Sequence, residues 1–468
     1  MLCTRKHNCV MLEEELKFDV EDDFSLPAIR GLRTKGRKKL VATYFDTADL
    51  RLARCGASLR HRVGDELPWT VKLPTGVPGV RHEISMAGPR VKPPVDLVWL
   101  VASLTRGAPL RRAAVLRSDR QVHIAGGIEI ADDRVLSGAM TFREIELELL
   151  EGGERKELST LERVLKRAGA RPSPFPSKLV RVLGERAMRP PDLVPPSGDS
   201  GVSGQELVRQ AIRKGVERML WHDPLVRLGD PLPDGDTPVH QMRVGCRRLR
   251  SDLRTFSAML DPGWVDWLRS ELKWVADLLG AARDIEVLRA RLRVTASADP
   301  LAPTDPAAIA AIDSRLAERH ALALKELEEG LRTGRYVDLV EELTRATREQ
   351  PFAARELKVR EARKLPAKAE ALAPEDPDES WHQVRILAKR ARYAADALGF
   401  KPRAKALAAV QDLLGEHQDA AVAAQTWLEF ASDPALAVTA GRLYERERAR
   451  IRQVRAEFPA VWQRVERA

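Results

Sequence analysis

Apolar and polar residues alternate in a series of short segments along the first part of the chain. The segments are LEEELKF, SLRHRV, PWTVKL, VRHEISM, GIEIADDRV and FREIELELL, and turns that contain Gly or Pro separate them. A period of two residues is typical of strands that turn one face toward a core. Two stretches with helical spacing interrupt the series, near residues 95–105 and 154–169. The pattern therefore predicts an antiparallel β domain with flanking helices.

The second part of the chain has a different pattern. Ala-, Leu-, Arg- and Glu-rich runs repeat with a period near 3.6, and the turn sequences DPLPDGDTP, ASADPLAPTDP and APEDPDES separate them. Such runs are typical of helices. Between the two parts, RPPDLVPPSGDSGVSG at 189–204 has no periodicity and is predicted to be a linker. We expect an α+β multidomain protein, with a β domain over 11–188 and an all-α domain over 205–465.

The helical part contains an internal duplication. VHQMRVGCRRLR (239–250) is similar to WHQVRILAKRAR (381–392), and DLLGAARD (277–284) is similar to DLLGEHQD (412–419). Coincidence between Ala- and Arg-rich helices is the alternative, but both blocks recur in the same order. The duplication predicts two related helical bundles, over about 205–335 and 336–465.

Composition limits the functional classes. A chain of 468 residues exceeds a usual single domain, and its net charge of +10 favours a polyanionic partner: nucleic acid, an acidic membrane or a phosphate polymer. It has no apolar run of the roughly 18 residues that a membrane span needs, and its start lacks the apolar core of a signal peptide. The expected location is the cytoplasm. Cys3, Cys9, Cys55 and Cys246 lack metal-ligand spacing and are predicted to be free thiols.

Charged and polar side chains share one face on strand after strand. The sets are Glu13, Glu15 and Lys17; Arg60 and Arg62; Thr70 and Lys72; Arg81 and Glu83; and Glu144, Glu146 and Glu148. A single charged face is usually solvated, with ion pairs worth about 0–1 kcal/mol each. Its repetition favours a common polar interior, which a barrel of about eight strands provides.

Such an interior needs ligands that compensate its charges. Clustered glutamates repel one another unless a hard cation lies between them, and their oxygens suit Mg²⁺ or Mn²⁺. Arg and Lys side chains in the same cavity need an anion, and phosphate matches both. The combination indicates a metal-chelated polyphosphate.

The motif Glu13-x-Glu15-x-Lys17 resembles the ExExK signature of the CYTH family, the triphosphate tunnel metalloenzymes. The similarity continues through YFDTADLRLARCGASLRHR (44–62), TVK (70–72), EIELEL and SKLVR (177–181). The resemblance implies an eight-stranded antiparallel tunnel, a divalent metal ion and hydrolysis of a triphosphate without a covalent intermediate.

The resemblance also assigns roles by position. It implies that Glu13, Glu15 and Lys17 are catalytic, and that the metal is held by Glu13, Glu15, Glu146 and Glu148, with Glu144 as the alternative to one of the last two. The implied phosphate contacts are Lys17, Arg60, Arg62, Lys72, Arg117, Arg120 and Lys178. Asp119 lies between Arg117 and Arg120, so the sequence leaves open which arginine faces the tunnel.

Two basic stripes run along the helical part. His240, Arg243, Arg247, Arg250 and Arg254 lie at offsets 0, 3, 7, 10 and 14, on one helix face. His382, Arg385, Lys389 and Arg392 repeat the first four offsets, and Asp396 ends the second stripe. A solvated face is the ordinary explanation. However, acidic partners at i±4 are largely missing, so these charges repel unless an anion compensates them.

These stripes resemble the CHAD domain, the conserved-histidine α-helical domain, over about 204–460. The similar blocks are HDPLVR, VHQMRVGCRRLRSDLRTF, LGAARDIEV, WHQVRILAKRARY and LGEHQDAAV. The resemblance implies that both stripes, with Arg283, bind inorganic polyphosphate. Gly280 and Gly415 are predicted at tight turns or close helix approaches, and Asp284 and Asp419 at helix caps.

The sequence thus predicts a metal-dependent inorganic triphosphatase joined to a polyphosphate-binding module, associated with polyphosphate granules in the cytoplasm. Two alternatives stay open: a non-catalytic polyphosphate-binding protein, and a tunnel enzyme for an organic triphosphate such as thiamine triphosphate or ATP. Nucleic acid is disfavoured as a partner because the stripes lack interleaved aromatic residues for base stacking.

Overall fold

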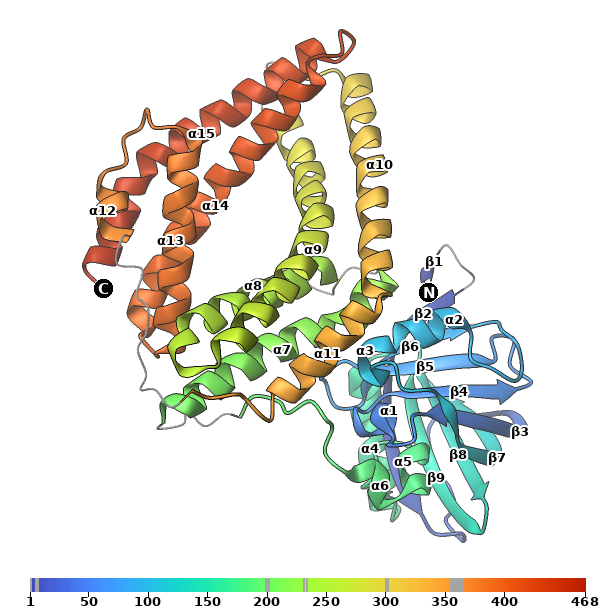
Figure 1. Cartoon of the computed structure of the whole chain (residues 1–468). Coiled ribbons are helices and arrows are strands. Elements are labelled where there is room, and N and C mark those ends of the chain that lie inside the picture. The colour runs from blue at the N-terminus through green and yellow to red at the C-terminus, as the bar shows by residue number, and fades with distance from the viewer. Residues whose placement is uncertain are drawn as a thin grey trace. The chain divides into compact units, whose positions relative to one another are not determined.

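The computed structural model describes residues 2–4, 8–197, 203–229, 232, 235–298, 303–353 and 365–468, with side chains from residue 11 onward except that of residue 397. The chain divides into two compact units, Met1–Asp192 and Leu193–Ala468 (Figure 1). This boundary falls inside the segment 189–204 that was predicted to be a linker. Cys55 and Cys246 are free thiols. The side chains of Cys3 and Cys9 lie outside the described residues.

In the described residues of the first unit lie the strands and six short helices. Its strands are β1 (Leu2–Thr4), β2 (Asn8–Val20), β3 (Arg33–Asp46), β4 (Ser58–Val63), β5 (Trp69–Pro74), β6 (Val80–Met86), β7 (Arg111–Ala125), β8 (Ile128–Ser137), β9 (Met140–Leu149) and β10 (Arg171–Pro172). Its helices are α1 (Arg51–Arg54), α2 (Val95–Leu100), α3 (Ala102–Thr105), α4 (Arg155–Arg167), α5 (Lys178–Leu183) and α6 (Glu185–Met188).

Eight of these strands close into an antiparallel barrel, as the sequence predicted. The order is β2-β6-β5-β4-β3-β7-β8-β9, and β9 pairs back to β2. Strand β2 closes the barrel because it changes partner along its length: Asn8–Glu14 pair with β6, and Glu15–Val20 pair with β9. The acidic motif therefore lies across the point of closure.

The barrel is apolar outside and charged inside over much of its circumference. Phe18 of β2, with Ile145 and Leu147 of β9, packs in one cluster with Leu161 and Leu165 of α4. This helix covers the outer face of the strands, so the alternate residues of β2 and β9 face the interior.

Helix α5 closes one end of the barrel. Its Leu179 and Val180 pack with Ala42 and Tyr44 of β3, on the inward face of that strand. Its Arg181 donates to Asp19 of β2 at 2.8 Å. Because α5 is inserted at the end where β3 finishes, the barrel has one closed end.

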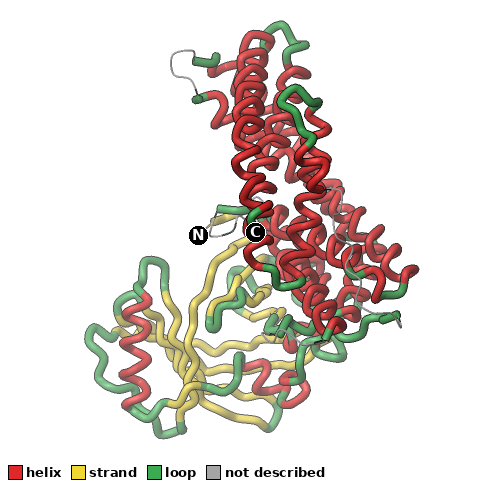
Figure 2. The backbone as a smooth tube through the Cα atoms, turned by 90° about the vertical axis from the view of Figure 1, so that its left-hand side faces the viewer, coloured by secondary structure: helices red, strands yellow, loops and turns green. Residues whose placement is uncertain are grey.

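The second unit is helical over its described residues (Figure 2). Its helices are α7 (Gly204–Leu228), α8 (Pro238–Thr255), the 3₁₀ helix η1 (Ser257–Met259), α9 (Pro262–Ala296), α10 (Pro306–Leu331), α11 (Gly334–Ala346), α12 (Leu365–Glu370), α13 (Asp378–Ala397), α14 (Lys401–Phe430) and α15 (Ala437–Glu466). Helices α8, α9 and α10 pack in succession, and α13, α14 and α15 repeat this order. Within the described residues, no helix is long and apolar enough to span a membrane.

Four positions of the duplication differ from expectation. Gly280 and Asp284 lie inside α9, and Gly415 and Asp419 lie inside α14, so the predicted turns and caps at these positions are wrong. At Gly280 of α9, a Cβ would lie 3.3 Å from Nε of the Arg243 side chain. At Gly415 the corresponding distance to Nε of Arg385 is 3.8 Å, so equivalent arginines lie over both glycines.

Candidate functional site

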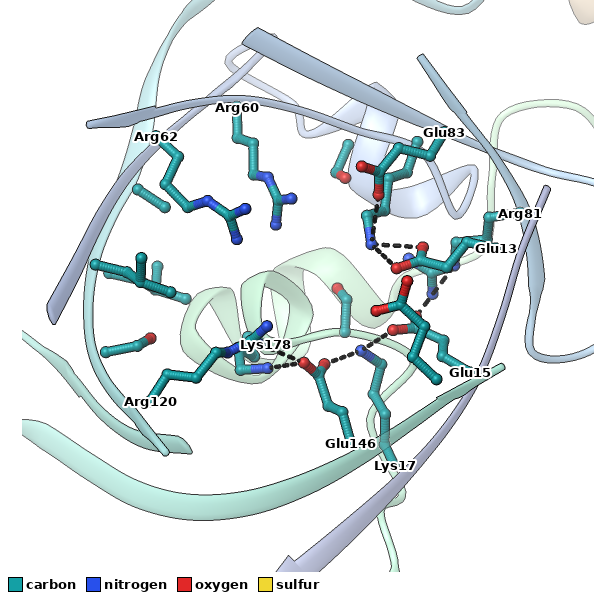
Figure 3. Close-up of a pocket in the computed structure, with 18 of the residues that line it drawn as sticks. Glu13, Glu15, Lys17, Arg60, Arg62, Arg81, Glu83, Arg120, Glu146 and Lys178 are labelled. Carbon is teal, nitrogen blue, oxygen red and sulfur yellow. Dashed lines mark hydrogen bonds and ion pairs between the residues drawn. The ribbon is translucent and has the colours of Figure 1, made fainter. Parts of the chain in front are cut away.

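A cavity of about 200 Å³ lies inside the barrel. Ten of the residues predicted for the tunnel line it: Glu13, Glu15, Lys17, Arg60, Arg62, Lys72, Arg120, Glu146, Glu148 and Lys178 (Figure 3). Tyr44, Arg81, Glu83 and Glu129 also line it. Strand alternation brings these side chains to one interior, while their metal-binding, phosphate-binding and catalytic roles stay predictions.

The glutamates of the β2 motif form ion pairs with lysines. Nζ of Lys72 lies 2.5 Å from Glu13 and 3.1 Å from Glu83. Nζ of Lys17 donates to Glu15 at 3.0 Å and to Glu146 at 2.5 Å. Burial alone would raise the pKa of Glu15, but Lys17 and Lys72 outweigh it and lower the pKa to about 2. Glu15 is therefore ionised at neutral pH.

A second charged cluster surrounds Lys178, the first residue of α5. Its Nζ lies 2.9 Å from Asp133, 2.7 Å from Glu144 and 2.7 Å from Glu146. Arg120 donates through Nε to Asp133 at 2.9 Å and through Nη2 to Glu146 at 2.7 Å. Glu144 is thus joined to the cavity through Lys178, although it does not line the cavity itself.

Asp133 is a functional candidate that was not predicted from the sequence, as are Tyr44 and Glu129 of the cavity wall. The Asp133 side chain is fully buried and accepts from Arg120 while pairing with Lys178. The signal was present in the segment GIEIADDRV, because strand alternation puts Asp133 on the same face as Glu129.

Arg60 and Arg62 extend from β4 into the cavity on the wall opposite Glu146 (Figure 3). Arg62 pairs with Asp65. Within the described residues, Arg60 forms no ion pair with a carboxylate, and its buried Nε has no hydrogen-bond partner. A buried guanidinium group of this kind can bind an anion without first losing a carboxylate partner.

The structure separates Arg117 from Arg120. Arg117 is exposed, and its odd position along β7 puts it on the face opposite to Arg120. Asp119 lies on that outer face as well, where it pairs with Arg37 at 2.6 Å. The expectation that Arg117 lies in the tunnel is therefore corrected, because only Arg120 of these two arginines lines the cavity.

The donor set of the cavity has the chemistry that a hard cation requires. Glu148 faces Glu129 across the β8–β9 pair, and burial together with Glu13 raises the pKa of Glu148 to about 7. A cation would relieve this crowding of carboxylates. However, within the described residues no group of three or more His, Cys, Asp or Glu side chains is arranged to hold a metal ion. The carboxylates of Glu13 and Glu15 form ion pairs with lysines instead.

A second cavity, of about 370 Å³, lies between the two helical repeats. Its basic lining consists of Arg243, Arg247 and Arg250 from α8 and His382, Arg385 and Lys389 from α13. Asp277, Asp284 and Asp419 also line it. We call this cavity the helical groove. The two stripes predicted from the sequence therefore meet, and two equivalent pairs, Arg243 with Arg385 and Arg247 with Lys389, lie on one surface.

Few of the arginines in the helical groove are compensated. Nη2 of Arg243 lies 3.5 Å from Asp284. Buried Nε atoms of Arg243, Arg250 and Arg385 have no hydrogen-bond partner among the described residues. Burial and the neighbouring Arg243 lower the pKa of Arg247 to about 10. This crowding of like charges favours an anionic ligand.

Four of the residues predicted to bind polyphosphate do not line the helical groove: His240, Arg254, Arg283 and Arg392. Arg283 pairs with Glu286 at 3.0 Å, and Arg392 donates to Gln411 at 3.0 Å. Asp396, which ends the second stripe, pairs with Arg248 of α8 at 2.6 Å. The Asp396 carboxylate therefore forms an ion pair between α8 and α13.

Comparison with known proteins assigns both units to families. A closed antiparallel barrel with a charged interior is followed by a duplicated helical unit with a basic groove, and each matches a family model. The CYTH domain model matches residues 11–171, and the CHAD domain model matches residues 210–428. The chain belongs to the proteins that join a CYTH domain to a CHAD domain. It is 31% identical to an uncharacterized protein of Mycobacterium tuberculosis, over 98% of this chain and 97% of that protein.

Solved structures are similar to parts of the chain. PptA from Streptomyces chartreusis is 23% identical over 55% of this chain and 98% of its own, with a TM-score of 0.47. The CHAD domain from the plant Ricinus communis is 24% identical over 58% of this chain and 95% of its own, with a TM-score of 0.45. HpAC1 from Hippeastrum, described as having a dominant triphosphatase activity, is 20% identical over 37% of this chain and 95% of its own, with a TM-score of 0.25.

Proposed function

We propose that this protein is a metal-dependent triphosphatase that hydrolyses inorganic triphosphate in the tunnel, and that its helical unit binds inorganic polyphosphate. The observation that carries the proposal is the composition of the tunnel wall. Basic groups and glutamates together line a cavity of about 200 Å³. Binding of an anion alone would need only the basic groups.

The basic residues of the tunnel would bind the phosphoryl oxygens. Arg60 is the group most ready to do so, since it has no carboxylate to release. Lys17 and Lys178 are held in place by Glu146, so their ammonium groups are oriented before substrate enters. Such groups neutralise charge on the phosphoryl group during transfer, which is the main requirement of this reaction.

Glu13, Glu15, Glu146 and Glu148 would hold the divalent ion, Mg²⁺ or Mn²⁺, and CYTH enzymes typically use divalent metals. When bound, the ion would polarise a phosphoryl oxygen and lower the pKa of the attacking water. Binding requires Lys72 and Lys17 to exchange their glutamate partners for phosphate oxygens, because both lysines contact these carboxylates.

In the proposed reaction, the oxygen of water forms a bond to the terminal phosphorus. The bond from that phosphorus to the bridging oxygen breaks, and its electron pair stays on the diphosphate that leaves. The products are phosphate and diphosphate, and the proton of the water passes to solvent. Because the protein forms no covalent bond, the wall has only to bind, orient and compensate charge.

A second candidate is supported by the ion pairs of the tunnel. Glu13, Glu15 and Glu146 all contact lysine. These pairs neutralise the carboxylates without metal, so a tunnel that grips a polyphosphate end but does not cleave it is the main competing function.

A phosphate-release screen tests both candidates. The purified chain is incubated with triphosphate, long-chain polyphosphate, thiamine triphosphate or ATP, each with Mg²⁺, Mn²⁺ or EDTA. The proposal expects the fastest release from triphosphate and none in EDTA. Binding of all substrates without release from any of them would favour the second candidate. Faster release from thiamine triphosphate or ATP would assign the tunnel to an organic triphosphate.

A further inference from the structure

The barrel is closed at one end only. Helix α5 fills the end where β3 finishes, by packing against Ala42 and Tyr44. At the other end β3 begins and the turn between β4 and β5 lies. Met11 and Lys38 face inward there, and both are exposed, Met11 by 43%. A linear substrate can therefore enter this barrel only through the open end, with one terminus of the substrate first.

Strand β3 extends past the cavity at the open end. It pairs with β4 only over Val41–Phe45, whereas its pairing with β7 continues back to Arg33. Leu40 and Ala42 line the cavity. Lys38 has the same parity as these two residues and lies one step further toward the opening.

Lys38 lies directly opposite Arg120 in the β3–β7 pair. Like charges in this relation destabilise a sheet unless something compensates them. Arg120 is compensated by Asp133 and Glu146. Lys38 is exposed and forms no ion pair within the described part of the chain, so its positive charge at the open end has no carboxylate partner.

An exposed strand edge offers an ordinary reason for lysines, because their charge prevents pairing with another chain. This reason applies to Lys39 as well, which is exposed on the same edge. Lys39 lies opposite Asp119, on the outer face of the barrel. Substitution of each lysine can therefore distinguish edge protection from a role at the open end. Either lysine could protect the edge, whereas of the two only Lys38 faces the opening.

We propose that Lys38 forms an outer subsite for a linear polyphosphate whose terminal phosphates occupy the tunnel. The inference rests on the proposed triphosphatase function and extends its substrate class to longer chains, cut from the end. Water attacks the terminal phosphorus, the adjacent P–O bridge breaks, and the products are phosphate and a chain shorter by one unit. Lys38 is a binding residue in this scheme and takes no part in bond breaking.

The test compares Lys38→Gln with Lys39→Gln in the full chain, using triphosphate and polyphosphate of about 50 units. Both variants keep the helical groove, so its contribution to long-chain binding is equal. Lys38→Gln should lower kcat/KM for the long chain by about two- to fivefold relative to triphosphate, the effect of one exposed charge pair. Lys39→Gln should leave this ratio unchanged. Thermal unfolding of both variants checks that the barrel is intact.

Product analysis supplies a second measurement. Electrophoresis of the long chain should show stepwise shortening with phosphate release, without early fragments of intermediate length. Equal ratios for the two variants, or such fragments, would overturn the inference. Wild-type protein that cleaves triphosphate but not the long chain would overturn the inference alone. Wild-type protein that cleaves neither would overturn the proposed function together with it.

Discussion

The tunnel and the helical groove are both rich in basic side chains, but they differ in how those charges are compensated. In the tunnel, Lys17, Lys72 and Lys178 each contact at least one glutamate within 3.1 Å. In the helical groove, Arg247 and Arg385 form no ion pair within 4.0 Å among the described residues. Binding of an anion would therefore have a different free-energy cost in the two cavities.

The difference indicates different tasks. A balanced site holds its groups in place and must exchange partners when ligands arrive, which suits a metal ion and a reacting phosphoryl group. In a site without such compensation, the positive charges repel one another, and a bound polyanion would relieve this repulsion. Such a site favours high affinity for the polyanion. Salt should accordingly weaken binding at the helical groove more than it weakens turnover in the tunnel.

The largest expected effect comes from Glu13→Gln combined with Glu15→Gln. Metal-dependent phosphate release from triphosphate should fall by about 100-fold or more, because the double variant loses two carboxylates of the tunnel wall. Polyphosphate binding at the helical groove should persist. Phosphate release and binding by isothermal calorimetry measure the two properties.

Glu14→Gln is the matched control for that double variant. Glu14 lies between the two glutamates but pairs with Arg155 on the outside of the barrel at 2.8 Å. Its substitution should change neither property. Undiminished release from the double variant would mean that the tunnel is not the catalyst.

The next effect concerns the helical groove. Arg243→Gln with Arg385→Gln should weaken polyphosphate binding by about tenfold or more and make the remaining binding less sensitive to salt. Arg315→Gln is the control, because Arg315 is exposed and pairs with Asp433 at 2.6 Å. Titrations at two salt concentrations measure both effects. Similar losses in the control and the double variant would show that net charge, and not the groove, determines affinity.

Asp133→Asn should have an intermediate effect on the tunnel. Without the carboxylate, Arg120 and Lys178 lose a shared partner, and kcat/KM for triphosphate should fall by about tenfold through misorientation. Asp133→Glu should restore part of it. Separate kcat and KM values, with a melting curve, distinguish orientation from lost stability. A loss of stability with unchanged kinetics would make Asp133 purely structural.

The smallest expected effect comes from Asp419→Asn, which removes a negative charge from the helical groove. Polyphosphate affinity should rise by about two- to threefold. Burial raises the pKa of Asp419 despite Arg385, so its carboxylate takes up a proton at higher pH than usual. Wild-type affinity should therefore increase as pH falls into the acidic range, and Asp419→Asn should lose part of this increase. His382 is retained in both proteins, so the difference between their pH profiles reports Asp419; identical profiles would contradict the prediction.

Much of the fold could be predicted from local patterns in the sequence. The strands that these patterns did not predict have physical reasons for their absence from the prediction. Strands β4 and β6 coincide with SLRHRV and VRHEISM because each has one face toward a core. Strands β3 and β7 were not among the alternating segments. The first half of β3 extends past the barrel and is exposed on both faces, so no alternation is required there.

The candidate sites also divide into features that local patterns predicted and features that they did not. Alternation placed Glu13, Glu15 and Lys17 on one face, but not their partners, because β2 changes neighbour between Glu14 and Glu15. The stripes were evident from helical spacing, whereas the position of Asp284 and Asp419 in the helical groove was not, because the same motif is compatible with a helix start.

The sequence by itself determined which side chains share a face, since the period of a strand or a helix is a property of neighbouring residues. Only the tertiary structure decided that Lys178 meets Asp133, that Arg120 and not Arg117 enters the cavity, and that one end of the barrel is closed. These relations depend on strand register, on closure of β9 onto β2 and on where α5 inserts. Contacts between residues distant in sequence set them, and no local period records such contacts.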